Sequence, residues 1–187
     1  MTHALRRRGL HGIGLTELLQ EAQAPKGVLY HHFPGGKTEL AVAAIGAAAK
    51  ALGERLDALL QREADPAAAL RAWLADAQRQ LERSGFASGC PLATVALEST
   101  PEDTALRSAL AQAFAALRER LAAGLSRAGL PTARAAPIAS LLIAAYEGAL
   151  MQARVAGEAS ALRDTTDTLL GLLVRELREA APNPPTS

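Results

Sequence analysis

The chain has 187 residues, of which 49% are hydrophobic and 21% charged, a composition typical of a soluble globular protein that excludes a disordered one. The formal net charge of +1 does not by itself indicate a nucleic-acid or membrane partner. The lone cysteine, Cys90, excludes an intramolecular disulfide and favours a reducing cytoplasm. Alanine and leucine dominate the apolar residues and aromatic residues make up only 3%, so we predict an all-α fold.

We expect neither a secretory signal at residues 1–4 nor a membrane-spanning segment. Residues 1–4 begin no apolar signal region, and the longest apolar run, residues 137–146, is too short to span a bilayer. We therefore expect a cytoplasmic protein with no membrane partner. Positive charge gathers in the first 37 residues, which suits a nucleic-acid-binding head on a nearly neutral body.

Two short helices are predicted within that basic segment. Residues 15–23 carry apolar side chains at helical spacing, and Pro25 suits the first turn of a helix over residues 26–33. The Pro-Gly-Gly run at 34–36 ends it. Two short helices joined by a tight turn form a helix-turn-helix.

Longer helices are predicted for the rest of the chain. Lys37 opens the first of them, with one face formed by Leu40, Ala44, Ala47, Ala51, Leu56 and Leu59. The later helices are expected over residues 66–83 after an Asp65 cap, 88–98, from the start signal at 100–103 to Gly129, 132–157 and 160–180. Residues 181–187 are expected to form a disordered tail.

The second helix of a helix-turn-helix inserts its N-terminal residues into the major groove of DNA. Gly27 lets the backbone approach closely, and Val28 offers an apolar contact to a thymine methyl group. Tyr30 and His31 can donate to phosphate oxygens, and Lys37 adds a charged phosphate contact. The predicted DNA-binding residues are Thr16, Lys26, Gly27, Val28, Tyr30, His31 and Lys37. Tyr30 and Phe33 have a second interpretation as core residues. Because adjacent histidines on a helix point in different directions, we expect no metal site at His31 and His32.

The string Lys-Gly-Val-Leu-Tyr-His-His-Phe-Pro-Gly-Gly-Lys at residues 26–37 closely resembles the helix-turn-helix signature of TetR/AcrR regulators. The Pro-Gly-Gly-Lys insertion and Gly-Cys-Pro-Leu at residues 89–92 resemble the LmrA/YxaF-like subgroup. The resemblance implies a homodimer with a DNA-binding domain over residues 1–45. It also implies a TetR-type helical domain over residues 46–180 that dimerises and binds an inducer.

Three positions depart from that family pattern. The resemblance implies a complete first helix, of which only residues 2–8 remain here, so the head would lose part of its three-helix core. Ile13 stands where a Thr or Ser that touches phosphate is common, and Gly14 or Thr16 could partly substitute. Gln23 replaces the usual turn glycine, at a cost of about 1 kcal/mol for a left-handed backbone.

The last two helices are predicted to form the dimer interface as a four-helix bundle. The interface residues would be Ile138, Leu141, Leu142, Ala145, Ala149, Leu162, Leu169 and Leu173. An intramolecular core is the alternative interpretation of the same stripes.

An inducer pocket is expected among the middle helices, because such pockets are largely apolar with a few polar groups. Its predicted lining is Trp73, Phe86, Cys90, Leu92, Val95, Phe114, Leu117, Tyr146, Glu147 and Met151. Each of them, taken singly, is more often plain core. Glu147 is the better candidate for a specific contact, and Cys90 is a weaker candidate for oxidant sensing.

The sequence shows no nucleotide-binding loop, no metal-ligand spacing and no nucleophile–base pair, so we expect neither an enzyme nor a cofactor. The hypothesis is a repressor that binds palindromic operator DNA and is released by a small-molecule inducer. The alternative is a helical ligand-binding dimer that has lost DNA binding.

Overall fold

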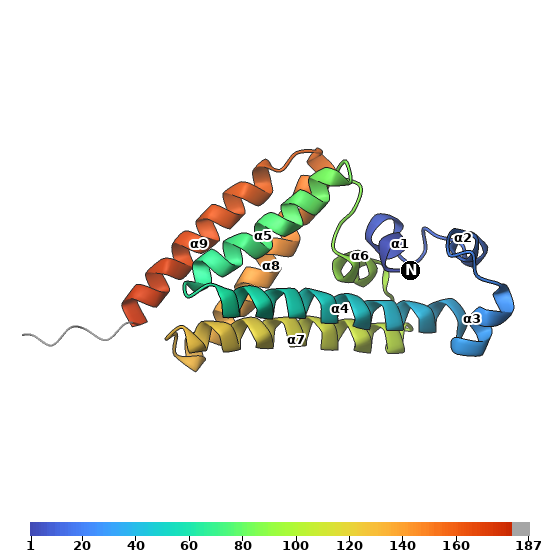
Figure 1. Ribbon diagram of the computed structural model, residues 1–187, viewed down its shortest axis with the longest axis horizontal. Helices are drawn as coiled ribbons and strands as arrows, with labels where there is room; N and C mark the ends of the chain where they lie inside the picture. Colours follow the sequence, from blue (N-terminus) through green and yellow to red (C-terminus); the bar gives the residue numbers. More distant parts are fainter. Residues whose placement is uncertain (181–187) are drawn as a thin grey trace, which may run out of the picture. The chain divides into compact units, whose positions relative to one another are not determined.

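The computed structural model describes residues 1–180, and in this range all regular structure is helical, which confirms the all-α prediction (Figure 1). The predicted tail, residues 181–187, lies outside the described residues. The helices are α1 Thr2–Arg8, α2 Leu15–Glu21, α3 Lys26–His32, α4 Gly36–Arg62, α5 Pro66–Arg83, α6 Pro91–Glu98, α7 Thr104–Arg127, α8 Thr132–Ala156 and α9 Ser160–Ala180.

The start of α5 and the end of α8 lie close to where local capping signals predicted them. The Asp65 carboxylate accepts a hydrogen bond of 2.9 Å from the amide of Ala67, and Pro66 fills the first helical position of α5. At the far end of α8, Gly157 adopts a left-handed backbone with φ of 70° and donates its amide to the carbonyl of Ala153. These caps explain why the bounds of α5 and α8 agree with the sequence.

The predicted start of α7 at residues 100–103 is wrong, because α7 begins at Thr104. The Asp103 carboxylate accepts hydrogen bonds from the Thr100 amide (2.8 Å) and the Thr100 hydroxyl (3.1 Å), which lower the pKa of Asp103. These bonds close a turn in front of the helix. The Arg107 amide then donates to the carbonyl of Asp103 at 2.9 Å, which places the helix start after Asp103.

The chain forms two compact units. The first unit comprises residues 1–51 and 87–115, and the second comprises residues 52–86 and the chain from 116 onward. The first unit therefore holds α1, α2, α3 and α6 complete, and the second holds α5, α8 and α9 complete.

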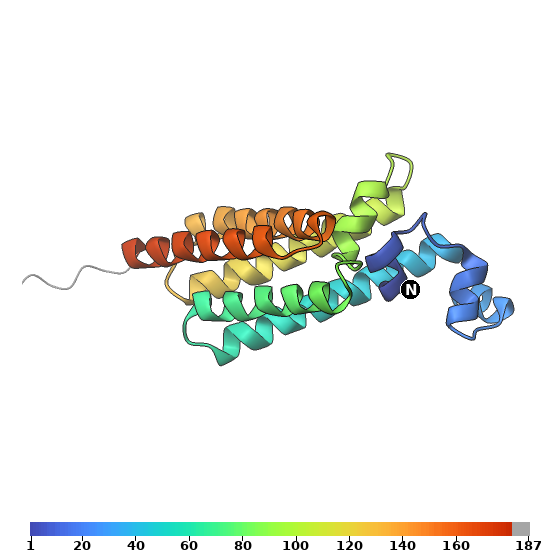
Figure 2. The same cartoon turned by 90° about the horizontal axis from the view of Figure 1, so that it is seen from above.

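The first unit has a small apolar core around α1 and α2. Ala4, Ile13 and Leu18 are buried there, with Met1, Leu15 and Leu40 packed against them. Leu5 of α1 is also fully buried. Helix α1 therefore contributes buried side chains to the core of the head. The views agree that α6 lies beside α1 (Figures 1 and 2).

The second unit is built on the packing of α8 against α9 and of α5 against both (Figure 1). The rings of Trp73 on α5 and Tyr146 on α8 stack at a tilt, with centroids 5.0 Å apart. Arg71 on α5 forms an ion pair of 2.8 Å with Asp167 on α9. The core of this unit includes Leu70, Trp73, Leu74, Leu81, Leu142, Tyr146, Leu150, Leu169, Leu170 and Leu173.

The turn between α2 and α3 contains the left-handed residue expected from the sequence, Gln23, with φ of 50°. Gln23→Gly should raise the free energy of unfolding by about 1 kcal/mol, because glycine adopts this conformation without a Cβ clash. Thermal and urea unfolding measure the change. The matched control is Gln20→Gly at an exposed position of α2, which should lower the free energy of unfolding by a similar amount through lost helix propensity. A Gln23→Gly protein less stable than the parent would contradict the strain at this turn.

Candidate functional site

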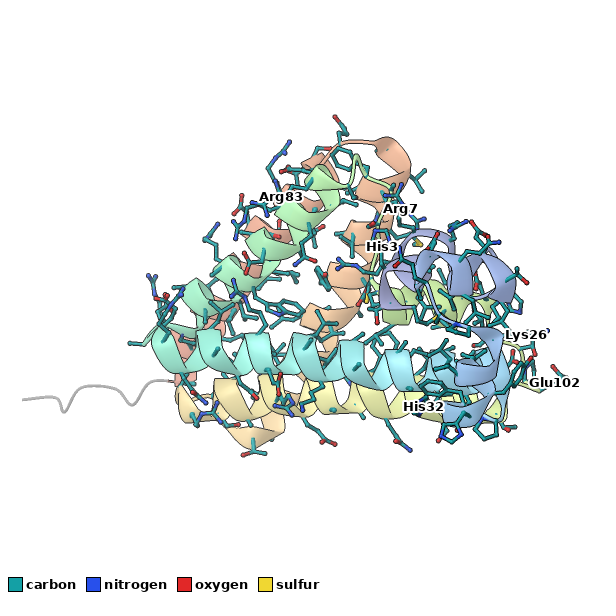
Figure 3. The ribbon with its side chains drawn as sticks, turned by 45° about the vertical axis from the view of Figure 1, so that its right-hand side comes forward. His3, Arg7, Lys26, His32, Arg83 and Glu102 are labelled. Carbon is teal, nitrogen blue, oxygen red and sulfur yellow. The ribbon has the colours of Figure 1, made fainter. Side chains whose placement is uncertain are left out.

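Helix α3 has almost all of its side chains on the surface of the first unit. Leu29 is its only buried residue, while Val28 is 47% and Tyr30 44% exposed. Lys26 and His32 lie on the outside of the N-terminal helices (Figure 3). The predicted residues Lys26, Gly27, Val28, Tyr30 and His31 thus share one short, exposed helix. The interpretation of Tyr30 as a core residue is wrong because its side chain is exposed, whereas Phe33 is half-buried.

The glycine at position 27 is not required by the packing of the chain itself. A Cβ built on Gly27 would meet no atom within 4 Å, and the residue is exposed. Gly36 differs, because its φ is 68° and the Tyr30 ring lies 3.5 Å from the position of its Cβ. A glycine costs up to about 1 kcal/mol relative to alanine in a helix, and no close contact within residues 1–180 requires Gly27 in the first turn of α3.

The start of α4 provides the setting of Lys37. The Glu39 carboxylate accepts a hydrogen bond of 2.7 Å from the Gly35 amide and satisfies this donor in front of the helix. A phosphate group near the start of α4 would therefore be bound by the Lys37 ammonium group, because the Gly35 amide already donates to Glu39. Lys37 itself is half-buried.

At the start of α2, Ile13 and Thr16 have different surroundings. Ile13 is fully buried in the core of the head, so it is a packing residue. Gly14 occupies the cap position and has no side chain with which to cap the helix, and Thr16 is exposed in the first turn. Thr16 is thus accessible for the predicted phosphate contact.

The positive charge of the Arg6–Arg8 run is partly neutralised within the first unit. Arg8 forms ion pairs with Glu17 at 2.5 Å and Glu21 at 2.9 Å, both on α2. The hydrogen bond that the Arg8 guanidinium donates to the Glu17 carboxylate raises the pKa of Arg8. The Arg6 guanidinium donates to the Gly89 carbonyl at 3.2 Å. Arg8 therefore links α1 to α2, and Arg6 links α1 to the residues in front of α6.

The adjacent histidines of α3 meet edge to face. The rings of His31 and His32 have centroids 5.0 Å apart and an interplanar angle of 76°. Within residues 1–180, no three His, Cys, Asp or Glu side chains are grouped so that they could hold a metal ion.

The predicted ligand residues are divided between the units. Trp73, Phe86, Leu117, Tyr146, Glu147 and Met151 belong to the second unit, and Cys90, Leu92, Val95 and Phe114 to the first. In the second unit the rings of Trp73 and Tyr146 are buried, and so is the Oε2 atom of Glu147. Met151, in contrast, is 51% exposed on α8. In the first unit Cys90, Leu92 and Val95 are buried.

The sequence did not indicate a groove of about 470 Å³ between α5 and α9. None of the ten predicted ligand residues lines this groove. Its walls combine apolar positions with three arginines and two aspartates, namely Asp65, Ala67, Ala68, Arg71, Asp167, Leu170, Gly171, Val174, Arg175 and Arg178.

Most of the predicted interface residues are packed inside the second unit. Leu142, Ala149, Leu162, Leu169 and Leu173 are buried, while Ile138 and Ala145 are half-buried. Among the eight, Leu141 is exposed.

The opposite side of α8 carries a second apolar stripe, Leu141, Ala144, Gly148, Met151 and Val155, which we call the outer α8 stripe. Leu141 is 52% and Val155 85% exposed. The spacing of 3 and 4 residues was the sequence signal for this stripe. Both sides of α8 are apolar. By length and composition alone, α8 could therefore cross a bilayer.

A helix-turn-helix with an exposed second helix, joined to a helical unit, is the architecture of a DNA-binding transcriptional regulator. Residues 66–168 match the family model of the transcriptional regulator LmrA/YxaF-like C-terminal domain. An uncharacterized HTH-type transcriptional regulator of Mycobacterium tuberculosis is 32% identical over 94% of this chain and 91% of its own. The HTH-type transcriptional regulator LmrA of Bacillus subtilis is 27% identical over 93% of both chains.

The crystal structure of the regulatory protein TetR from Rhodobacter sphaeroides is 27% identical, with a TM-score of 0.79 over 90% of this chain and 92% of that one. The chain therefore belongs to the TetR family of transcriptional regulators, in its LmrA/YxaF-like group.

Proposed function

We propose that this protein is a cytoplasmic repressor that binds a palindromic operator as a homodimer and is released by a small-molecule inducer. Residues 1–45 would form its DNA-binding domain, and residues 46–180 its ligand-binding and dimerisation domain.

The single observation that carries this proposal is the exposure of α3. A seven-residue helix that leaves Val28 and Tyr30 on the surface gains little from burial in its own chain. Gly27 adds a further cost that internal packing does not explain. A partner that approaches the backbone closely explains both, and the major groove of DNA accepts a helix in this way. Lys26 and Tyr30 would then contact base edges and phosphate.

The outer α8 stripe supports the homodimer. Monomeric proteins seldom leave a continuous apolar strip exposed, and a helix paired with its symmetry mate would bury this one. A Cβ built on Gly148 would meet no atom within 4 Å, so a second helix has room to approach there. Leu172 of α9 is a further exposed apolar residue on the helices predicted to dimerise. Dimerisation accounts for the apolarity of α8 without a membrane.

The buried aromatic pair supports a ligand site in the second unit. Trp73 and Tyr146 supply apolar and aromatic surface, and Glu147 supplies a buried carboxylate oxygen on the same helix as Tyr146. A small-molecule site usually combines apolar surroundings with a small number of polar groups. Glu147 would be the group that selects among ligands.

Selection of random duplex DNA by the purified full-length protein tests the proposal. We expect a palindromic consensus with half-sites about one helical turn apart, bound by two chains and weakened by added salt. Failure to enrich any sequence, or binding that does not respond to salt, would contradict DNA recognition. Binding of one chain to a single half-site would instead contradict the dimer.

A further inference from the structure

The turn that joins α1 to α2 is held by a single carboxylate from the end of α6. Oε2 of Glu98 accepts hydrogen bonds from the backbone amides of Leu10 (2.6 Å) and His11 (3.1 Å). The same oxygen lies 3.5 Å from Nδ1 of His11. We call this arrangement the Glu98 clasp. All of its members belong to the first unit, and Glu98 is separated from Leu10 by 88 positions in the sequence.

The backbone at Gly9 is shaped to admit this carboxylate. Gly9 has φ of 70° and ψ of −167°, a region that only glycine adopts readily. A Cβ built on Gly9 would overlap the carboxylate of Glu98. The glycine thus serves both the turn and the clasp, and any side chain here would strain the backbone and displace Glu98.

Helix α6 is fastened to α1 at its other end as well. The Gly89 amide donates to the Arg6 carbonyl at 2.9 Å, and the Arg6 guanidinium donates to the Gly89 carbonyl at 3.2 Å. Between these ends, Leu92 and Val95 of α6 are fully buried. Hydrogen bonds at both ends of α6 therefore connect it to α1 and to the turn that follows α1.

From α1 the contacts continue to the helix-turn-helix. Arg8, the last residue of α1, pairs with Glu17 and Glu21 of α2. The polar contacts therefore run from α6 through α1 to α2 without leaving the first unit.

We propose that Glu98 is a positioning residue for DNA recognition: it fixes the α1–α2 turn on α6 and so sets the orientation of α2 and α3. Hydrogen bonds from two amides to one charged carboxylate are stronger than neutral ones and are directional, which suits this role. The proposal rests on the proposed function, since it concerns how the DNA-binding helices are held.

The test combines amide hydrogen exchange with DNA binding, for the full-length protein and the variants Glu98→Ala and Glu98→Gln. In Glu98→Ala we expect the Leu10 and His11 amides to exchange about tenfold faster or more, and the dissociation constant for the selected duplex to rise about tenfold. Glu98→Gln keeps an oxygen acceptor without the charge and should lie between Glu98→Ala and the parent. The matched controls, Glu119→Ala and Glu119→Gln, make the same changes at an exposed position of α7 in the second unit.

A double-mutant cycle with Gly9→Ala tests the geometry itself. The new methyl group meets the Glu98 carboxylate only when that carboxylate is present. In the Glu98→Ala background, Gly9→Ala should therefore cost less DNA affinity than in the parent, and the two effects should not add. Additive effects would overturn the contact between the two residues.

The outcomes separate the clasp from the wider function. Unchanged exchange at Leu10 and His11, or DNA affinity within about twofold of the Glu119 variants, would overturn the positioning role. If the parent binds no DNA, the proposed function fails and the positioning role with it, while exchange at the two amides still decides whether Glu98 holds the turn. Measurements below the melting temperature of each variant keep loss of fold from imitating loss of positioning.

Discussion

Gly27→Leu is expected to weaken binding to the selected operator about 100-fold or more and to leave the protein folded and slightly more stable. The two effects have opposite signs because they arise from different partners. A side chain at this exposed position enters open space in the free protein, since a Cβ there meets no atom within 4 Å. Replacing a helical glycine also gains up to about 1 kcal/mol of helix propensity.

In the DNA complex the same side chain would separate the start of α3 from the base edges. Both half-sites lose contacts, and a lost base contact costs about 1–3 kcal/mol, so two copies in one dimer give the expected loss. Fluorescence anisotropy with the labelled duplex measures affinity, and thermal unfolding measures stability.

Gly46→Leu is the matched control for this substitution. Gly46 is also helical and exposed, and a Cβ there would also meet nothing within 4 Å, but it lies on α4. It should raise stability in the same way and leave DNA affinity unchanged. Equal DNA affinity in the Gly27 and Gly46 variants would show that α3 does not enter the groove.

Local capping signals predicted the start of α5 and the end of α8, but not the start of α7. The Asp65–Pro66 pair and Gly157 act on their own neighbours, and α5 and α8 have the expected bounds. The prediction placed Asp103 in the first turn of a helix that begins after Thr100. The start of α7 was misplaced because the Asp103 carboxylate can also close a turn with Thr100 in front of the helix. In the folded chain Asp103 closes the turn. The same four residues, 100–103, can therefore begin a helix or form a turn, and the sequence alone does not distinguish the two.

The buried face of an alanine-rich helix is harder to predict than its ends. On α4 the predicted face included Ala47 and Ala51, which are exposed, whereas Ala41 and Ala48 are buried. Alanine gains little from burial, so an alanine-rich helix has little hydrophobic contrast to identify its inner side. The same ambiguity affects α8, where both sides are apolar.

Five of the predicted DNA-binding residues are neighbours in the sequence and lie on α3, whose one buried residue is Leu29, and their contact with DNA stays a prediction. The Glu98 clasp could not be predicted from the sequence. Its carboxylate meets backbone amides far away in the sequence, and backbone donors leave no pattern of residue types. The glycine at position 9 is the one visible trace, and a glycine after a helix has many explanations.

Leu141→Arg is expected to raise the dissociation constant of the dimer about 100-fold or more. In a twofold interface each substitution occurs twice, so two unpaired charges would have to be buried for the chains to associate. The exposed position of Leu141 in the single chain lets arginine extend into solvent, so the monomer should stay folded. Sedimentation velocity over a range of protein concentrations measures the shift.

Two comparators make the result specific to the outer α8 stripe. Leu97→Arg makes the same change at another exposed leucine, 76% exposed on α6, and should leave the dimer intact. Leu142→Ala truncates a buried neighbour and should lower the free energy of unfolding by about 2–5 kcal/mol. The Leu142→Ala protein that stays folded should still form the dimer. Leu142 thereby tests whether the predicted residues on the inner side of α8 serve the core or the interface.

Loss of the dimer should carry over to DNA binding, because a monomer contacts a single half-site. The Leu141→Arg protein should then bind a palindrome no more tightly than an isolated half-site, although α3 itself is unchanged. A Leu141→Arg protein that sediments as a dimer would place the interface away from the outer α8 stripe. Tight palindrome binding by a monomeric Leu141→Arg protein would instead show that two heads act without a shared interface on α8, which the proposed repressor does not allow.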